Sequence, residues 1–220
     1  MMNMKKILFF ILIIIISSCH FNVLTSNYLN HVIFIDPGHG GKDNGTHYND
    51  IFEDELNLKL ATIIYEDIIN DGGICYLSRV NDYDLSSMYA KNHKIEDLNK
   101  RIKYISESKS SLFISLHLNY YNSDKVNGLQ VFYQKNNKDS EMLANIMQNI
   151  LNKENKKDKK SKIGDYYILN NCNTTGVLIE FGFLSSEYDR KRLLDEKYLK
   201  KLSKLIQKGI NEYLNEIDKY

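Results

Sequence analysis

The chain has 220 residues, which is enough for one α/β domain and a short extension. Hydrophobic residues make up 43% of the sequence and charged residues 26%, the composition of an ordinary globular protein with a core. The 29 basic residues nearly balance the 28 acidic ones, giving a net charge of +1. Nucleic-acid-binding proteins usually concentrate positive charge against phosphates, so no nucleic-acid partner is expected.

Residues 1–19 have the order of an export signal. Lys5 and Lys6 are followed by the unbroken apolar run 7–16, and two serines then precede Cys19. The run is too short to span a bilayer comfortably and suits the apolar region of a signal peptide. Its ending resembles the box at which lipoproteins are cleaved and acylated, so Cys19 is a candidate lipidation site and an ordinary signal peptide is the alternative. We expect an exported protein of the periplasm or cell envelope, attached to the membrane through its N-terminus if Cys19 is acylated.

The rest of the sequence predicts a short linker at 20–30 and one folded domain at 31–218. Only Cys75 and Cys172 follow the signal segment, and neither has a CxxC neighbour, so a zinc site built from cysteines is not expected. Whether these two cysteines form a disulfide stays open, because spacing along the sequence does not report distance in space.

Apolar runs and helical stripes alternate along this domain. In chain order the pattern predicts a strand at 31–36, a helix at 55–70, a strand at 74–77, a helix around 98–105, strands at 112–116 and 128–133, a helix at 142–151, a strand at 177–181 and a helix at 195–217. Strands that alternate with helices indicate an α/β domain with a largely parallel sheet covered on both faces. Two polar stretches interrupt the pattern, a surface loop at 80–94 and a lysine-rich, solvated or mobile segment at 153–162.

Groups capable of chemistry follow three of the predicted strands. The first strand runs into the turn Asp-Pro-Gly-His-Gly-Gly at 36–41, His117 comes just after the run 112–116, and Glu180 lies near the end of 177–181. In an open α/β sheet such strand ends gather at one edge. Burying an unpaired polar group costs roughly 2–7 kcal/mol, and a shared metal ion would compensate for that cost.

Zinc is the metal that this donor set favours, because catalytic zinc sites use histidine nitrogens and a carboxylate and keep one position open. His39 and His117 supply the nitrogens, and the third ligand is expected from Glu53, Asp54 or Glu55. Glu53 precedes two apolar positions of the predicted helix by three and seven residues and so faces inward, whereas Glu55 can form an exposed pair with a lysine four residues later. We therefore expect one Zn²⁺ on His39, Glu53 and His117.

Glu180 remains as the acid that takes a proton from the attacking water. Asp36 and Asn119 are candidates for orienting the histidines. Each of these groups alone also fits a structural role, since a histidine at a strand end is often only hydrogen-bonded and a glutamate at a helix start complements the helix dipole. Their joint occurrence favours the metal site, with His47 as a spare candidate ligand.

Four ordered segments of the chain resemble motifs of the zinc-dependent N-acetylmuramoyl-L-alanine amidases of type 3, a family that includes bacterial cell-separation and sporulation amidases. They are 35–43, 53–58, 113–119 and 178–185, with secondary matches at 78–79, 81–82, Leu98 and Arg101. The resemblance implies a twisted, mostly parallel sheet of about six strands between helices. It also implies metal ligands at His39, Glu53 and His117, a catalytic glutamate at Glu180, and peptidoglycan as the substrate, cut between N-acetylmuramic acid and L-alanine.

The chain departs from the family pattern beside the expected cleft. Ser186 stands where an asparagine is usual, Asn170 where an arginine is common and Gly176 where Pro-Ala is common, which puts the peptide preference in doubt. Arg79 is a candidate for orienting a ligand or touching substrate.

The sequence leaves alternative functions open. The protein could be a zinc peptidase or deacetylase of the same polymer, or an inactive wall-binding protein. The alternative role of the lysine-rich run is contact with anionic wall polymer. We expect a monomer and leave an activator protein open.

Overall fold

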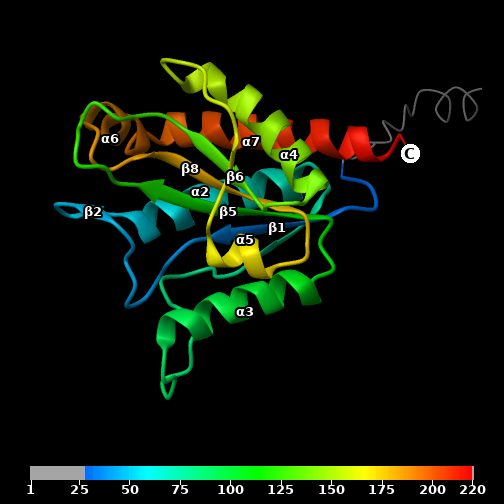
Figure 1. Cartoon of the computed structure of the whole chain (residues 1–220), viewed down its shortest axis with the longest axis horizontal. Helices are drawn as coiled ribbons and strands as arrows, with labels where there is room; N and C mark the ends of the chain where they lie inside the picture. The colour runs from blue at the N-terminus through cyan, green and yellow to red at the C-terminus, as the bar shows by residue number, and fades with distance from the viewer. Residues whose placement is uncertain (1–27, 220) are drawn as a thin grey trace, which may run out of the picture.

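A six-stranded sheet forms the centre of the computed structural model, which describes residues 28–219 (Figure 1). The strands lie in the order β4-β1-β5-β8-β6-β7. Their bounds are β1 Val32–Pro37, β4 Ile74–Leu77, β5 Leu112–Asn119, β6 Gln130–Tyr133, β7 Lys162–Ile163 and β8 Gly176–Phe183, and a separate hairpin consists of β2 His47–Tyr48 and β3 Ile51–Phe52. All neighbouring strands of the large sheet are parallel except β6 and β8, which are antiparallel. The predicted signal segment and Cys19 lie outside the described residues.

Helices cover both faces of this sheet, as the sequence predicts. They are α2 Glu53–Asn70, α3 His93–Glu107, α4 Lys138–Leu151, α5 Tyr167–Asn171, α6 Glu187–Leu193 and α7 Glu196–Ile217, with a 3-10 turn η1 at Asn152–Glu154. In Figure 1, α4 and α7 lie above the sheet and α3 lies below it. Within residues 28–219 no helix has both the length and the hydropathy needed to cross a membrane.

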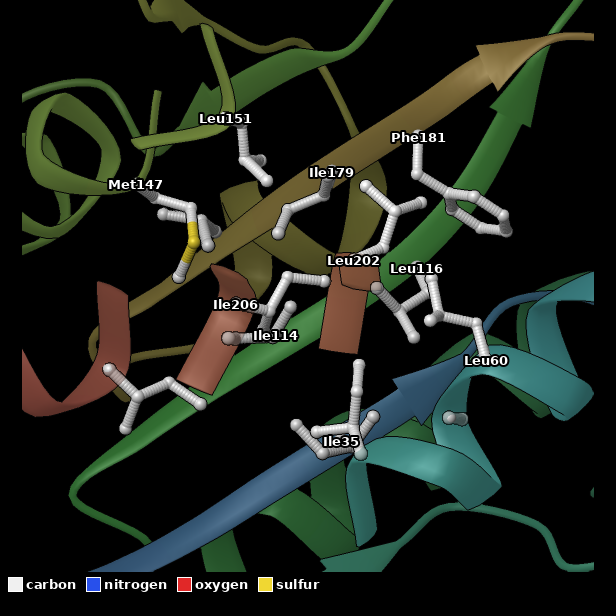
Figure 2. Packing of buried hydrophobic residues seen from close by; sticks show 14 of the residues in the cluster. Ile35, Leu60, Ile114, Leu116, Met147, Leu151, Ile179, Phe181, Leu202 and Ile206 are labelled. Carbon is white, nitrogen blue, oxygen red and sulfur yellow. The ribbon is translucent and has the colours of Figure 1, made fainter. Parts of the chain in front are cut away.

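The two faces bury separate cores because side chains alternate along each strand. The larger core joins β1, β5 and β8 to α2, α4 and α7, and Figure 2 shows Ile35, Ile114 and Ile179 of the strands meeting Leu60 of α2 and Leu202 of α7. The smaller core lies under α3 and α5 and contains aromatic side chains of β1 and β5. Burial on both faces explains why the central strands are almost continuously apolar in the sequence.

The two cysteines of the described chain lie in different cores. Cys75 belongs to the larger core and Cys172 to the smaller one, and both are buried and free. The possible disulfide left open by the sequence is therefore not formed. Desolvation raises the pKa of Cys75 to about 12, which is the behaviour of a small buried hydrophobe rather than of a reactive thiol.

Several element boundaries differ from the predicted ones for local reasons. Helix α3 begins at His93 because the side chain of Asn92 accepts a hydrogen bond from Ile95 N at 3.1 Å and caps it. Strand β5 continues past its apolar run, and its last residue still pairs with β8 after an irregularity. The lysine-rich segment is not simply solvated, because buried Glu154 pairs with Arg192 at 2.5 Å and the segment ends in β7.

Candidate active site

The predicted zinc ligands come together at one edge of the sheet. Strands β1, β5 and β8 are adjacent and parallel, so their carboxyl ends meet there. The turn after β1 carries His39, β5 carries His117 and the first turn of α2 carries Glu53, and one ligand atom from each lies within 4.8 Å of the other two. Glu53 Oε1 is 3.2 Å from His39 Nε2 and 3.1 Å from His117 Nδ1. These atoms, together with Glu180, line a cavity of about 400 Å³.

Two buried arginines hold the turn that presents His39. Arg101 donates to the carbonyl oxygens of Pro37 at 2.7 Å and His39 at 2.6 Å, and Arg79 donates to Pro37 at 3.1 Å and Gly38 at 3.0 Å. His39 has a φ of 60°, a left-handed conformation that a residue other than glycine adopts only at a cost. The arginines offset that cost by satisfying the carbonyl oxygens of the turn.

Asp36 acts on this turn indirectly. Its carboxylate accepts hydrogen bonds from Arg101 at 2.7 Å, Ser78 at 2.6 Å and Ser115 at 2.7 Å, and it makes none to a histidine. Asn119 likewise makes no bond to a histidine, because its Oδ1 accepts from the next backbone N–H. Neither side chain contacts a ligating ring; Asp36 holds Arg101, which in turn donates to the carbonyl oxygen of His39, and a role for either residue in orienting the histidines stays a prediction.

Glu53 is a carboxylate that its surroundings orient closely. Its Oε1 accepts from Leu118 N at 3.0 Å and its Oε2 from Thr46 N at 2.8 Å. Burial opposes its charge, but hydrogen bonds and charge interactions with His117 and His39 hold its pKa well below the usual range. The inward-facing position that helical periodicity predicted is correct, since only 3% of Glu53 is exposed.

The neighbouring acids of α2 differ from Glu53 in their surroundings. Glu55 is exposed as expected, but within the described residues it forms no ion pair with Lys59. Asp54 is buried, its Oδ1 has no hydrogen-bond partner, and desolvation followed by the charge of Asp82 raises its pKa to about 6. Of the three acids, Glu53 alone joins the two histidines.

The donor set fits a catalytic zinc ion. Two imidazole nitrogens face one carboxylate oxygen, which is the combination found where zinc keeps an open position. The other ring nitrogen of His39, Nδ1, lies 3.0 Å from Asp43 Oδ2, and such a carboxylate fixes the tautomer that leaves Nε2 as the ligand atom. Burial alone would lower the pKa of His39, but its hydrogen bonds to Asp43 and Glu53 raise it to about 9, so this pocket stabilises positive charge.

Glu180 lies beside the three ligands with an unused acceptor. It is 6% exposed, and its Oε2 is buried with no hydrogen-bond partner. The other oxygen, Oε1, accepts a hydrogen bond from the Tyr166 hydroxyl at 3.1 Å. Desolvation raises the pKa of Glu180 to about 7 against the opposing charge of His117. A carboxyl group with this pKa can both accept and return a proton near neutral pH.

Sequence reasoning missed two groups of the site and included one that does not take part. Asp43 follows His39 by four residues inside a recognised motif, so its spacing was an available signal. Tyr166 precedes a short helix, and nothing in the sequence links it to Glu180. The spare candidate His47 is exposed in β2, stacks on Phe52 with ring centroids 5.9 Å apart and lies outside the ligand cluster.

Comparisons with known proteins identify the family to which the chain is similar. Residues 33–212 match the family described as N-acetylmuramoyl-L-alanine amidase. The germination-specific N-acetylmuramoyl-L-alanine amidase of Bacillus subtilis is 35% identical over 190 residues, which are 84% of this chain and 80% of that protein. The CwlD amidase of Clostridioides difficile, solved in complex with the GerS lipoprotein, is 35% identical with a TM-score of 0.80, covering 84% of this chain and 99% of that one.

A second solved structure extends the likeness. The catalytic domain of CwlV, an N-acetylmuramoyl-L-alanine amidase from Bacillus (Paenibacillus) polymyxa, is 27% identical with a TM-score of 0.74, and the match covers 84% of this chain and 98% of that domain. The resemblance found in the sequence motifs is confirmed, and so is the fold. The chain belongs to the N-acetylmuramoyl-L-alanine amidase family.

Proposed function

We propose that this amidase hydrolyses the bond between N-acetylmuramic acid and L-alanine with one Zn²⁺ held by His39, Glu53 and His117, and with Glu180 as the general base. One observation carries the assignment of roles. Two imidazole nitrogens converge on one carboxylate oxygen at the cavity that Glu180 also lines, with its own oxygen unpaired. Membership of the amidase family supports the substrate class.

The protein's part in this reaction begins with orientation of the ligands. A bound Zn²⁺ supplies acidity to a water molecule and polarises the scissile carbonyl group. Asp43 keeps the proton of His39 on Nδ1, and the backbone N–H groups of Thr46 and Leu118 fix the carboxylate of Glu53. Because these groups are already in place, little reorganisation is needed when substrate arrives.

Proton transfer falls to Glu180. Tyr166 occupies Oε1, so the free oxygen Oε2 is the atom that receives the proton of the attacking water. The same oxygen then returns the proton to the nitrogen of the leaving L-alanine, which departs as a neutral amine. A pKa raised to about 7 by burial makes both transfers feasible at neutral pH.

The proposal also includes export of the protein to the cell envelope. Relatives of this chain include an amidase named for germination and the amidase LytC, both from Bacillus subtilis. We propose that residues 1–19 direct export to the cell envelope and that Cys19 is acylated, an inference that rests on the order of charged, apolar and small residues in the sequence.

The variant Glu180→Gln tests the assigned roles. It should keep one equivalent of zinc in elemental analysis and lose activity on muropeptides by about 10²–10⁴-fold, the usual contribution of a general base. His117→Ala is the matched control and should lose the zinc itself. Mass spectrometry of wild-type digests should show complete stem peptides with a free L-alanine amine. Shortened stems would instead indicate a peptidase, and loss of zinc from Glu180→Gln would show that Glu180 is a ligand.

A further inference from the structure

A second hollow of about 540 Å³ lies over the β6–β7 edge of the sheet. Its walls include Asn119 and Phe132 together with Lys159, Lys160 and Lys162, and none of its lining residues is acidic. We call this hollow the lysine groove. The lysines belong to the segment that the sequence marked as a basic run, and pairing of β7 with β6 places the end of that run against the sheet.

The lysine groove adjoins the catalytic cavity. Gln130, which lines the groove, is the strand partner of Glu180 across β6 and β8. Phe132 of the groove packs edge-on against Tyr166 of the catalytic cavity, with ring centroids 5.2 Å apart. Asn119 follows the ligand His117 by two residues in β5. A chain leaving the catalytic centre across β6 therefore enters the groove directly.

Two positive charges in the groove have no partner within the described chain. Lys159 donates to the carbonyl oxygens of Asn127 and Gly128 at 2.9 and 3.0 Å, so its ammonium group is already bound. Lys160 and Lys162 are exposed and form no ion pair with any residue of 28–219. These two ammonium groups are free to meet an anion.

Another hollow, which shares Asp43, Lys94 and Asp97 with the catalytic cavity, has a different charge. This hollow, of about 340 Å³, is lined by Asp43, Asp84 and Asp97 and by Lys42, His93 and Lys94. Asp97 is already paired with Arg101 and Asp43 with His39, so this hollow mixes both charges, whereas the lining of the lysine groove has positive charges alone. The two hollows therefore differ in charge, and of the two the lysine groove better suits a substrate segment that carries carboxylates.

Peptidoglycan has the matching asymmetry, because its stem peptide carries carboxylates and its N-acetylated glycan is largely neutral. We propose that the lysine groove is the stem-peptide subsite, in which Lys160 and Lys162 bind carboxylates beyond the scissile L-alanine; this proposal rests on the amidase function. Strand β7 lies two strand spacings from β8, about 10 Å. An extended peptide covers that distance in about three residues. The subsite is therefore expected to bind the carboxylates of the second and third residues of the stem peptide.

The double variant Lys160→Gln/Lys162→Gln tests the subsite with two muramyl tripeptides, one with free stem carboxylates and one with those carboxylates amidated. On the free-carboxylate substrate, KM should rise about tenfold, as expected for two exposed ion pairs of about threefold each, with kcat changed less than twofold. On the amidated substrate the variant should equal the wild type. Added salt should raise the KM of the wild type for the free-carboxylate substrate and leave its KM for the amidated substrate unchanged.

Lys59→Gln/Lys197→Gln is the matched control, since both lysines are exposed, unpaired within the described chain and absent from the groove. It removes the same charge and should leave both KM values unchanged. Calorimetric titration of the free stem tripeptide should show binding to the wild type about tenfold tighter than to the groove variant.

Equal KM changes on both substrates, or no change on either, would overturn the subsite. If the wild type cleaves neither substrate, the proposed amidase reaction is refuted, and the calorimetric titration then tests the stem-peptide subsite by itself. Equal affinity of the wild type and the groove variant for the free tripeptide would refute the subsite.

Discussion

Asp36 and Arg101 form a buried ion pair that supports the turn carrying His39. Asp36 is 1% exposed and lies 2.7 Å from the guanidinium of Arg101. Burial works to raise the pKa of Asp36, but Arg101 and the hydroxyls of Ser78 and Ser115 together lower it below its ordinary value. A carboxylate whose pKa is lowered by folding stabilises the native state above its unfolded pKa, and that contribution is lost as the pH falls through the folded value.

We therefore predict that Asp36→Asn lowers the free energy of unfolding by about 1–3 kcal/mol at pH 7, because it removes one of the two carboxylates that pair with the buried guanidinium of Arg101 and leaves only Asp97. The difference from the wild type should narrow as the pH falls below about 4, because unfolded wild-type protein then binds a proton at Asp36 that the folded protein, with its lower carboxyl pKa, does not bind. Urea unfolding of both proteins between pH 7 and pH 3 measures this difference. The exposed substitution Asp158→Asn is the control and should show no such trend. A difference that stayed constant with pH would contradict the account.

Residue roles were predictable where the sequence carried a period or a motif. Helical spacing separated Glu53 from Glu55, and a strand end marked His117. The bond from Tyr166 to Glu180 and the bond from Arg101 to the carbonyl of His39 join residues 14 and 62 positions apart. No local pattern encodes those contacts, because they depend on how β8, α3 and the turn after β1 are placed relative to one another.

The end of β1 and the strand β5 approach each other so closely that only glycine fits at position 38. A Cβ there would lie 2.2 Å from the His117 ring. Gly38→Ala should therefore displace that ring and weaken zinc binding by about 100-fold, the upper end for groups that orient ligands. The cost in unfolding free energy should be only about 1–3 kcal/mol, typical of overpacking. Competition with a chromophoric chelator measures the affinity, and thermal unfolding measures the stability.

Gly209→Ala offers a comparison in the same protein. A Cβ at this buried position in α7 would meet the flexible thioether of Met147, 2.6 Å away, which belongs to the larger core. The thioether can move, so zinc affinity should be unchanged. Equal zinc affinity in Gly38→Ala and the wild type would show that the close approach of Gly38 does not fix the ring of His117 for zinc binding.

The long elements were predictable and the short ones were not. Buried strands and amphipathic helices such as β5 and α7 extend over enough residues for a period to appear. The pair β2 and β3 and the helix α5 span only two to five residues each, too few for any periodicity. These short elements nevertheless place Glu53 and Tyr166, so the sequence predicted the scaffold better than the geometry of the site.

At the scale of the molecule, the larger hydrophobic core and the catalytic cavity lie at different places on the sheet. The larger core under α2, α4 and α7 contains most of the buried apolar side chains, whereas the catalytic cavity opens at the strand ends beside α3 and α5. The lysine groove lies beside that cavity on the same sheet, since its residue Gln130 pairs with Glu180 of the cavity. A monomeric state and acylation at Cys19 stay predictions from the sequence.

The most direct test is anomalous diffraction measured on either side of the zinc absorption edge from crystals of the zinc-loaded protein. The account predicts one strong peak, present only above the edge, within bonding distance of His39 Nε2, His117 Nδ1 and a carboxylate oxygen of Glu53, about 2.0–2.2 Å from each. A peak bound by other residues, or none at these three side chains in protein that cleaves muropeptides, would contradict it.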